Sequence, residues 1–198
     1  RPLLATSWKK VDDVTWLIQL RKGVKLHSGR EVTAEDIKAQ VEWALNTPKD
    51  WKPLRTKEYV RPLEKVEAID RYTLKMTLKT PNYVLFEPFV LVRGLRGLGD
   101  TEQLAKAGVR PIKEPIGSGP FKMVEWISGD HITIERNEQY WGKKPYLDRV
   151  VFRVIPDSQT RLLTLQKGEI DIATILPMQS VPQVQKDPNL NLVKVVRV

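Results

Sequence analysis

The chain has 198 residues, 41% of them hydrophobic and 29% charged, and its 33 Lys and Arg against 24 Asp and Glu give a net charge of +9. Such a composition is typical of a folded globular protein with a core, and the lack of cysteine excludes disulfides and thiolate metal sites. The basic residues form no run of five like charges, which favours a solvated basic surface over nucleic-acid binding. No apolar run approaches the roughly 18 residues that span a membrane, and the stretch Arg1 to Ala5 is too short for a secretory signal, which leaves export open.

The N-terminal half predicts two β-hairpins around one helix. In the second hairpin apolar residues alternate strictly with polar ones from Tyr72 to Lys79, the period of a strand with one buried face. Gly23 can supply the positive φ that a tight turn needs. The helix has a start signal, Thr33 followed three residues later by Asp36 in a capping-box pattern. We expect strands over 16–20, 24–26, 65–69 and 72–79, and a helix from Thr33 to Leu45.

The middle of the chain predicts short elements around a Gly-rich loop. We place a helix at 83–92, the loop at 93–100 and a second helix at 102–107. Pro111 and Pro115 then mark a boundary between subdomains, because proline interrupts regular structure. The expected domains are therefore 1–115 and 116–198.

The C-terminal part predicts a third hairpin followed by a β-α-β series. We expect hairpin strands over 121–126 and 131–136, a strand over 149–155, a helix over 158–166, a strand over 170–173, a helix over 179–186 that contains Pro182, and a strand over 192–198. Together these elements predict an α/β fold of mixed α+β type.

The segment Gly117-Ser118-Gly119-Pro120 is rich in glycine, as phosphate-binding loops are. It lacks the Gly-Lys-Ser/Thr ending that brings a lysine to phosphate, and it precedes a strand where phosphate loops precede a helix. The loop 93–99 has the same weakness, since no strand leads directly into it. A structural turn is the favoured interpretation of both.

The sequence displays no reactive constellation. The two histidines, His27 and His131, are expected to be exposed polar residues, and without cysteine they exclude a His-rich zinc site. No Gly-x-Ser-x-Gly elbow is present. The paired carboxylates Asp12-Asp13 and Glu35-Asp36 suit a turn and a helix start. We therefore predict no catalytic residue, no metal site and no cofactor; a hydrolase would need groups that the sequence does not show.

Four segments of the chain occur in an order that is specific to one family. They are Leu20-Arg21-Lys22-Gly23-Val24-Lys25-Leu26-His27-Ser28-Gly29, Thr33-Ala34-Glu35-Asp36-Ile37, Gly117-Ser118-Gly119-Pro120-Phe121, and the run from Arg136 to Ala173 with Tyr140-Trp141-Gly142. Together they resemble the family 5 extracytoplasmic solute-binding proteins of ABC importers. That family usually has Asp where this chain has Ser28, a difference that touches only turn chemistry.

The resemblance implies a two-lobed receptor of the periplasmic-binding-protein type II, which closes on its solute by a hinge motion. Residues 1–115 would be the hairpin-and-helix subdomain of the first lobe and 116–198 part of its central mixed sheet, with the second lobe absent. The implied function is non-catalytic capture of a small solute, foremost a peptide, and its delivery to membrane permeases. The implied setting is periplasmic or extracellular, associated with a membrane, and the implied state is a monomer.

Other functions stay open beside this one. The solute could be a metal chelate or a sugar, and the fold could serve an interaction or signalling domain. The candidate ligand-binding residues within the chain are Tyr83, Arg93, Arg96, Gly117, Ser118 and Gly119. By the resemblance, the acidic group that pairs with a peptide's amino terminus belongs to the second lobe. We therefore expect the chain alone to bind solute weakly or not at all.

Overall fold

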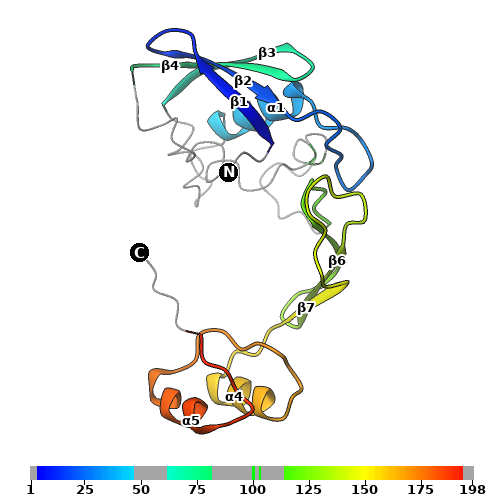
Figure 1. Cartoon of the computed structure of the whole chain (residues 1–198), viewed down its shortest axis with the longest axis vertical. Coiled ribbons are helices and arrows are strands. Elements are labelled where there is room, and N and C mark those ends of the chain that lie inside the picture. Colours follow the sequence, from blue (N-terminus) through cyan, green and yellow to red (C-terminus); the bar gives the residue numbers. More distant parts are fainter. Residues whose placement is uncertain (1–3, 47–61, 82–99, 101–102, 104–113, 194–198) are drawn as a thin grey trace. The chain divides into compact units, whose positions relative to one another are not determined.

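The computed structural model describes residues 4–46, 62–81, 100, 103 and 114–193 (Figure 1). Its elements are β1 Ala5–Lys10, β2 Thr15–Leu20, α1 Ala34–Leu45, β3 Leu63–Asp70, β4 Thr73–Leu78, β5 Phe121–Ile127, β6 His131–Arg136, β7 Arg149–Arg153, α4 Ser158–Gln166, the 3₁₀ turn η2 Met178–Ser180 and α5 Val181–Lys186. This mixture of strands and helices confirms the predicted mixed α+β class. The helix predicted over 83–92 lies outside the described residues. So do the loop predicted over 93–100, apart from Asp100, and the helix predicted over 102–107, apart from Gln103.

Two compact units divide the chain. One comprises Arg1–Trp126 with Ile132–Val151, and the other comprises Ile127–His131 with Phe152–Val198. The predicted subdomains 1–115 and 116–198 divide the chain at another position, and they stay a prediction.

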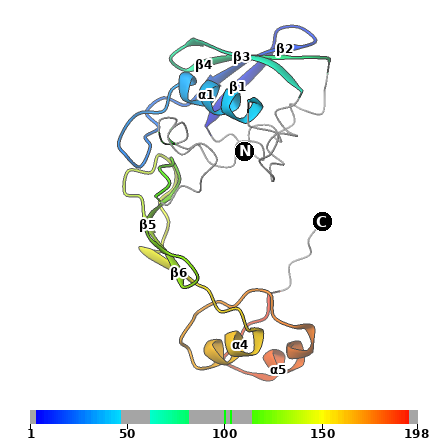
Figure 2. The same ribbon diagram turned by 180° about the vertical axis from the view of Figure 1, so that it is seen from behind.

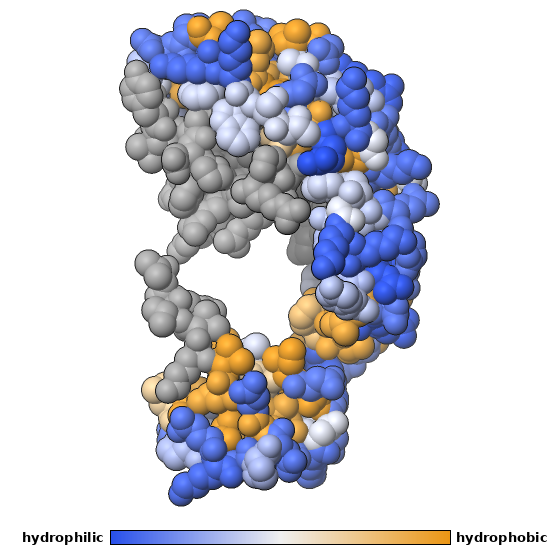
Figure 3. Space-filling view, in the orientation of Figure 1, coloured by the Kyte–Doolittle hydropathy of each residue, from blue (hydrophilic) through white to orange (hydrophobic). Residues whose placement is uncertain are grey.

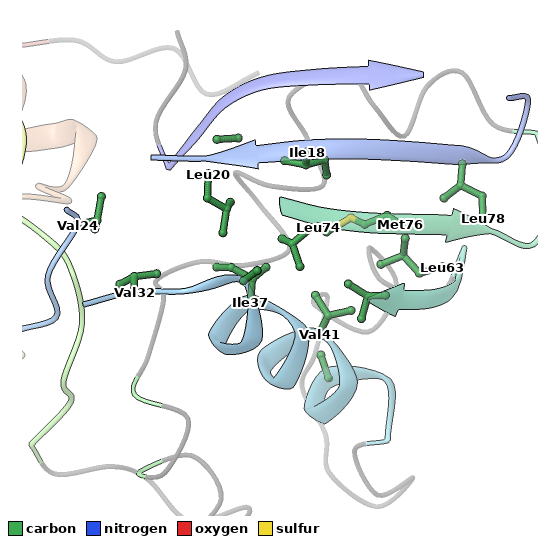
Figure 4. Packing of buried hydrophobic residues seen from close by; sticks show 14 of the residues in the cluster. Ile18, Leu20, Val24, Val32, Ile37, Val41, Leu63, Leu74, Met76 and Leu78 are labelled. Carbon is green, nitrogen blue, oxygen red and sulfur yellow. The ribbon is translucent and has the colours of Figure 1, made fainter. Parts of the chain in front are cut away.

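The core of the first unit lies between a four-stranded sheet and α1. The strand order is β1-β2-β4-β3, and each neighbouring pair is antiparallel. Alternate residues of β4 are buried, as the period of two predicts: Leu74, Met76 and Leu78 are at most 1% exposed. Figure 4 shows Ile37 and Val41 of α1 directed toward these side chains, so the helix covers one face of the sheet.

The first predicted hairpin is wrong in its pairing. Strand β2 pairs with β1 and β4, whereas residues 24–26 form no strand and contribute a single bridge, Lys25 to Glu31. Val24 and Leu26 are buried in the core at 0% and 2% exposure. Their alternation therefore serves packing. The strand predicted over 16–20 is confirmed as β2, and the turn residue Gly23, with φ of 75°, also behaves as predicted.

The third predicted hairpin is confirmed as β5 and β6, which lie beside each other in Figure 2. Strand β7 adds to β6, giving the order β5-β6-β7. At the end of β6, the Arg136 N–H donates to the carbonyl of Asp148, just before β7, at 2.7 Å. Just after β7, the Val154 N–H donates to the carbonyl of Asp130, which precedes β6, also at 2.7 Å. Because the start of one segment meets the end of the other, β6 and β7 are antiparallel.

The unit that holds α4 and α5 confirms both predicted helices. Asp157 caps α4 by accepting a hydrogen bond from the Thr160 N–H at 2.7 Å, and Pro182 lies in the first turn of α5, where proline is tolerated. The strand predicted over 170–173 is wrong. Those residues pair with no strand in the described part of the chain, and the Ile172 side chain is 81% exposed. Of the strand predicted over 192–198, residues 192 and 193 are irregular and the rest lie outside the described part.

Candidate functional site

The structure describes three of the six predicted ligand-binding residues. Gly117, Ser118 and Gly119 form an irregular, half-buried turn that leads into β5. Tyr83, Arg93 and Arg96 lie outside the described residues. The turn is therefore the part of the predicted site whose surroundings can be stated.

His27 holds this turn through its backbone and both ring nitrogens. The His27 N–H donates to the Gly117 carbonyl at 2.7 Å, and the Gly117 N–H donates to His27 Nδ1 at 3.1 Å. The second ring nitrogen, Nε2, lies 3.2 Å from the Gly119 carbonyl. The prediction that His27 is an exposed polar residue is wrong, because the ring is half-buried against the turn.

The buried side chain of Asn137 holds the turn from a second direction. Its Nδ2 donates to the Gly119 carbonyl at 3.1 Å, and its backbone N–H donates to the Pro120 carbonyl at 2.8 Å. Its Oδ1 accepts from the Gln139 N–H at 3.0 Å. Asn137 is only 6% exposed, so these bonds satisfy a buried amide. No sequence pattern indicates this role, apart from the place of Asn137 near the start of the run from Arg136 to Ala173.

Residues that precede the turn are held as well. The Asp100 N–H donates to the Ile116 carbonyl at 2.9 Å. The Gln103 side chain accepts from the Ile116 N–H at 2.9 Å and donates to the Glu114 carbonyl. The path of the chain from 114 to 119 is thus set by hydrogen bonds from residues distant in sequence.

Arg30 connects Asp100, which precedes the turn, to the start of α1. Its Nη1 lies 2.8 Å from Asp36 Oδ1, and its Nη2 lies 3.2 Å from Asp100 Oδ2. Asp36 also accepts from the Thr33 N–H at 2.8 Å, so the capping pattern predicted for Thr33 and Asp36 is used in the fold. One guanidinium therefore links the helix start with the segment that leads to the turn.

The run that begins at Arg136 is held together by charge. Glu138 pairs with Lys144 at 2.8 Å and with Arg136 at 2.7 Å. Hydrogen bonds from Lys144 and then Arg136 lower the pKa of Glu138 to about 2. Arg136 also pairs with Asp148 at 2.8 Å. These side chains tie the loop to the end of β6.

Packing explains why Trp141 and Gly142 occur in the sequence Tyr140-Trp141-Gly142. Trp141 packs against the core of the first unit, with the Arg21 guanidinium 4.9 Å from its ring centre. A Cβ at Gly142 would lie 2.7 Å from Cε1 of Tyr140, so only glycine fits there without a shift. This run supports the scaffold around the turn.

The turn offers groups that can form hydrogen bonds, and the described residues form no metal cluster. In ranges 4–46, 62–81 and 114–193, with Asp100 and Gln103, no three His, Asp or Glu side chains gather as metal ligands. No helix within those same ranges has the length and apolar character to cross a membrane. The turn offers backbone groups and the Ser118 hydroxyl, which are suited to polar contacts with a small molecule.

Comparison with known proteins gives a consistent match along the whole chain. The model of the bacterial extracellular solute-binding proteins, family 5 (Middle), matches residues 1–197. The oligopeptide-binding protein AppA of Bacillus subtilis is 33% identical over 96% of this chain and 35% of its own length. The nickel-binding periplasmic protein of Escherichia coli is 30% identical over 94% of this chain and 36% of its own length.

A solved structure supports the same fold. The periplasmic binding protein DppA of Helicobacter pylori, in complex with the peptide STSA, superposes with a TM-score of 0.80 at 32% identity. The match covers 94% of this chain and 40% of that one. The chain thus spans little more than a third of the length of the curated relatives it matches.

Proposed function

This chain belongs to the bacterial extracellular solute-binding proteins, family 5, and on that premise we propose that it contributes one wall of a cleft that captures a peptide for an ABC importer. The match over residues 1–197 carries the proposal. The family is one of solute-binding proteins, so the proposed mechanism is non-covalent and non-catalytic. The protein acts in the periplasm or outside the cell and hands its solute to membrane permeases as a monomer.

The turn Gly117–Gly119 is the proposed solute-facing part of this wall. It is half-buried and held from two sides by His27 and Asn137, so its backbone groups are fixed in direction. The bonds to His27 and Asn137 use the Gly117 N–H and the carbonyls of Gly117 and Gly119, and they restrain Ser118 between them. Restrained groups such as those of Ser118 bind a ligand at a smaller cost in ordering than mobile ones. Tyr83, Arg93 and Arg96 stay proposed contacts from the neighbouring sequence.

Exposed apolar side chains support the proposal that more protein packs onto the second unit. Figure 3 shows hydrophobic residues at the surface around α4 and α5. Phe152, Ile172, Ile175 and Met178 are between 56% and 83% exposed. A stable soluble protein seldom leaves so many large apolar residues in water. In a receptor of the length of its relatives, further chain would cover them.

The test compares the full-length protein with the 198-residue chain. We expect native mass spectrometry to find a peptide retained by the full-length protein, and calorimetry to show that the chain alone binds the same peptide at least about a hundredfold more weakly, a loss of about 2.7 kcal/mol. The physical reason is that one wall cannot enclose a solute. Binding of that peptide by the chain alone within about tenfold of the full-length affinity contradicts the proposal.

The same experiment decides between solutes. A nickel complex is a second candidate, because the E. coli relative that matches this chain is a nickel-binding protein. Its retention in place of a peptide would change the solute and leave the receptor role. A full-length protein that retains no solute and binds neither peptide nor nickel complex would favour the interaction or signalling alternative.

Gly119→Ala tests the turn itself. A Cβ at Gly119 would meet the Phe121 carbonyl oxygen at 3.7 Å, an ordinary contact, so the turn should keep its fold. We expect the full-length variant to bind its solute several-fold more weakly, since the methyl group narrows the approach to the backbone, with an unfolding free energy unchanged within about 0.5 kcal/mol. An unchanged affinity would remove Gly119 from the proposed contacts.

A further inference from the structure

The hydrogen bonds of His27 fix the protonation state of its ring. A backbone N–H can only donate, so the bond from Gly117 requires Nδ1 to accept. The ring is then neutral with its proton on Nε2, which donates to the Gly119 carbonyl at 3.2 Å. Both polar atoms of one imidazole thus serve the two ends of a single three-residue turn.

We propose that His27 is a pH-sensitive positioning residue, whose neutral ring holds the turn Gly117–Gly119 and whose protonation breaks the bond between the ring and the Gly117 N–H. A second proton would occupy Nδ1 and point at the Gly117 N–H, replacing an attractive contact by a repulsion between two donors. The bond from Nε2 to Gly119 would persist. Protonation therefore loosens the Gly117 end of the turn, where the bond from the His27 backbone N–H to the Gly117 carbonyl remains.

The surroundings of the ring oppose its positive charge. Its hydrogen-bond partners in the turn are backbone groups, and Asn137, which shares the Gly119 carbonyl, is neutral. Lys122 at the start of β5 adds a positive charge, although it is itself paired with Glu135 of β6 at 2.8 Å. On the turn of His27 itself, Arg30 is occupied by Asp36 and Asp100.

Burial first, and then the charge of Lys122, lowers the pKa of His27 below its ordinary 6.5, although the bond to Gly119 acts in the opposite direction. The unfolded chain therefore binds the proton more readily than the folded one, and stability rises with pH in this range. The contribution of His27 is complete above about pH 6.5. It is lost as the pH falls through the lower pKa of the folded state.

This device also regulates the proposed site. If the turn contacts solute, which rests on the proposed function, the affinity of the full-length receptor falls as the pH drops below about 6.5. A receptor outside the cytoplasm meets such changes of pH directly. The loss of the bond between the ring and Gly117 does not itself depend on any solute.

The test uses nuclear magnetic resonance on the 198-residue chain between pH 8 and pH 5. We expect the ring ¹⁵N shifts of His27 to report the Nε2–H tautomer at high pH. The Gly117 amide shift should follow the His27 titration. Below that titration the Gly117 amide should exchange about fivefold faster relative to its intrinsic rate, which corresponds to one net hydrogen bond.

Two variants test whether the pH dependence at Gly117 comes from the ring of His27. His27→Asn keeps an acceptor near the Nδ1 position but does not titrate, so the Gly117 amide should lose its dependence on pH. His131→Asn is the matched control, because His131 is the one other histidine of the chain and its ring pairs with Asp130 at 2.8 Å. In that variant the Gly117 amide shift should depend on pH as it does in the unsubstituted chain.

Three results would overturn the proposal: a proton on Nδ1 at high pH, a Gly117 amide that is silent while His27 titrates, or the same pH dependence in His27→Asn. The first two are measured on the unsubstituted chain, so a poorly folded variant does not remove the test. No solute is present, and failure here leaves the proposed function standing. Conversely, a full-length protein that binds no solute leaves the titration result intact.

Discussion

Replacing Ile18 with alanine is expected to lower the free energy of unfolding by about 2–5 kcal/mol. Ile18 lies in β2 between Trp8 of β1 and Leu74 of β4, and its side chain is fully buried at 0% exposure. The substitution removes three carbon atoms from the layer between sheet and helix, and the neighbours cannot close the space completely. Denaturant unfolding followed by tryptophan fluorescence measures the loss.

Ile69→Ala is the matched control in the same sheet. Ile69 lies near the end of β3 and is 55% exposed, so the same loss of atoms should cost less than about 1 kcal/mol. Because both variants change isoleucine to alanine, their difference reports burial alone. Equal losses would contradict the core described between the sheet and α1.

Local sequence patterns predicted those strands and helices whose periodicity or capping residues lie within the element itself. The period of two from Thr73 to Leu78 gave β4, and the capping pattern at Thr33 gave the start of α1. Pairing partners could not be predicted in this way. Strand β1 went unnoticed because four of its six residues, Thr6 to Lys9, are exposed and carry no apolar period. Its place beside β2 is set by tertiary contacts.

The candidate site shows the same limit. The turn at Gly117 was predicted as structural, and its glycine-rich sequence is enough for that inference. Its anchors were not predicted, because His27 and Asn137 are separated from it by 90 and 18 residues in sequence. A single polar residue has no periodicity, so its partner cannot be inferred from spacing. The order of the motifs identified the family where spacing alone could not.

The matched fold shows what His27 and Asn137 do for the family segments of the chain. The resemblance predicted part of a type II periplasmic binding protein, and the superposition on DppA with a TM-score of 0.80 confirms it. Within that fold the family-like segments meet in space: His27 of the first and Asn137 of the last both bind the Gly119 carbonyl of the third. Three of the segments therefore form one hydrogen-bonded unit around the turn.

Replacing Asp36 with asparagine is expected to lower the free energy of unfolding by about 2–3 kcal/mol. The Asp36 carboxylate is buried at 4% exposure and accepts from the Thr33 N–H at 2.8 Å, from the Thr33 hydroxyl at 3.1 Å and from Arg30. Asparagine has the same shape but only one acceptor oxygen, so its amide group must face one of these donors. With the amide oxygen at the Oδ2 position, the Thr33 bonds and a 3.0 Å bond from Arg30 Nη1 remain, but the amide nitrogen at the Oδ1 position turns the 2.8 Å ion pair into a contact between two donors.

Glu35→Gln is the matched control, since it removes a carboxylate from the same first turn of α1. Glu35 is 69% exposed and lies 3.4 Å from Lys38, an arrangement worth less than about 1 kcal/mol in water. A double-mutant cycle of Arg30→Met with Asp36→Asn should give a coupling of about 1–2 kcal/mol, because the two residues share one network. Without that coupling, the cost of Asp36→Asn would belong to the helix cap alone, and Arg30 would not connect α1 to the segment that leads to the turn.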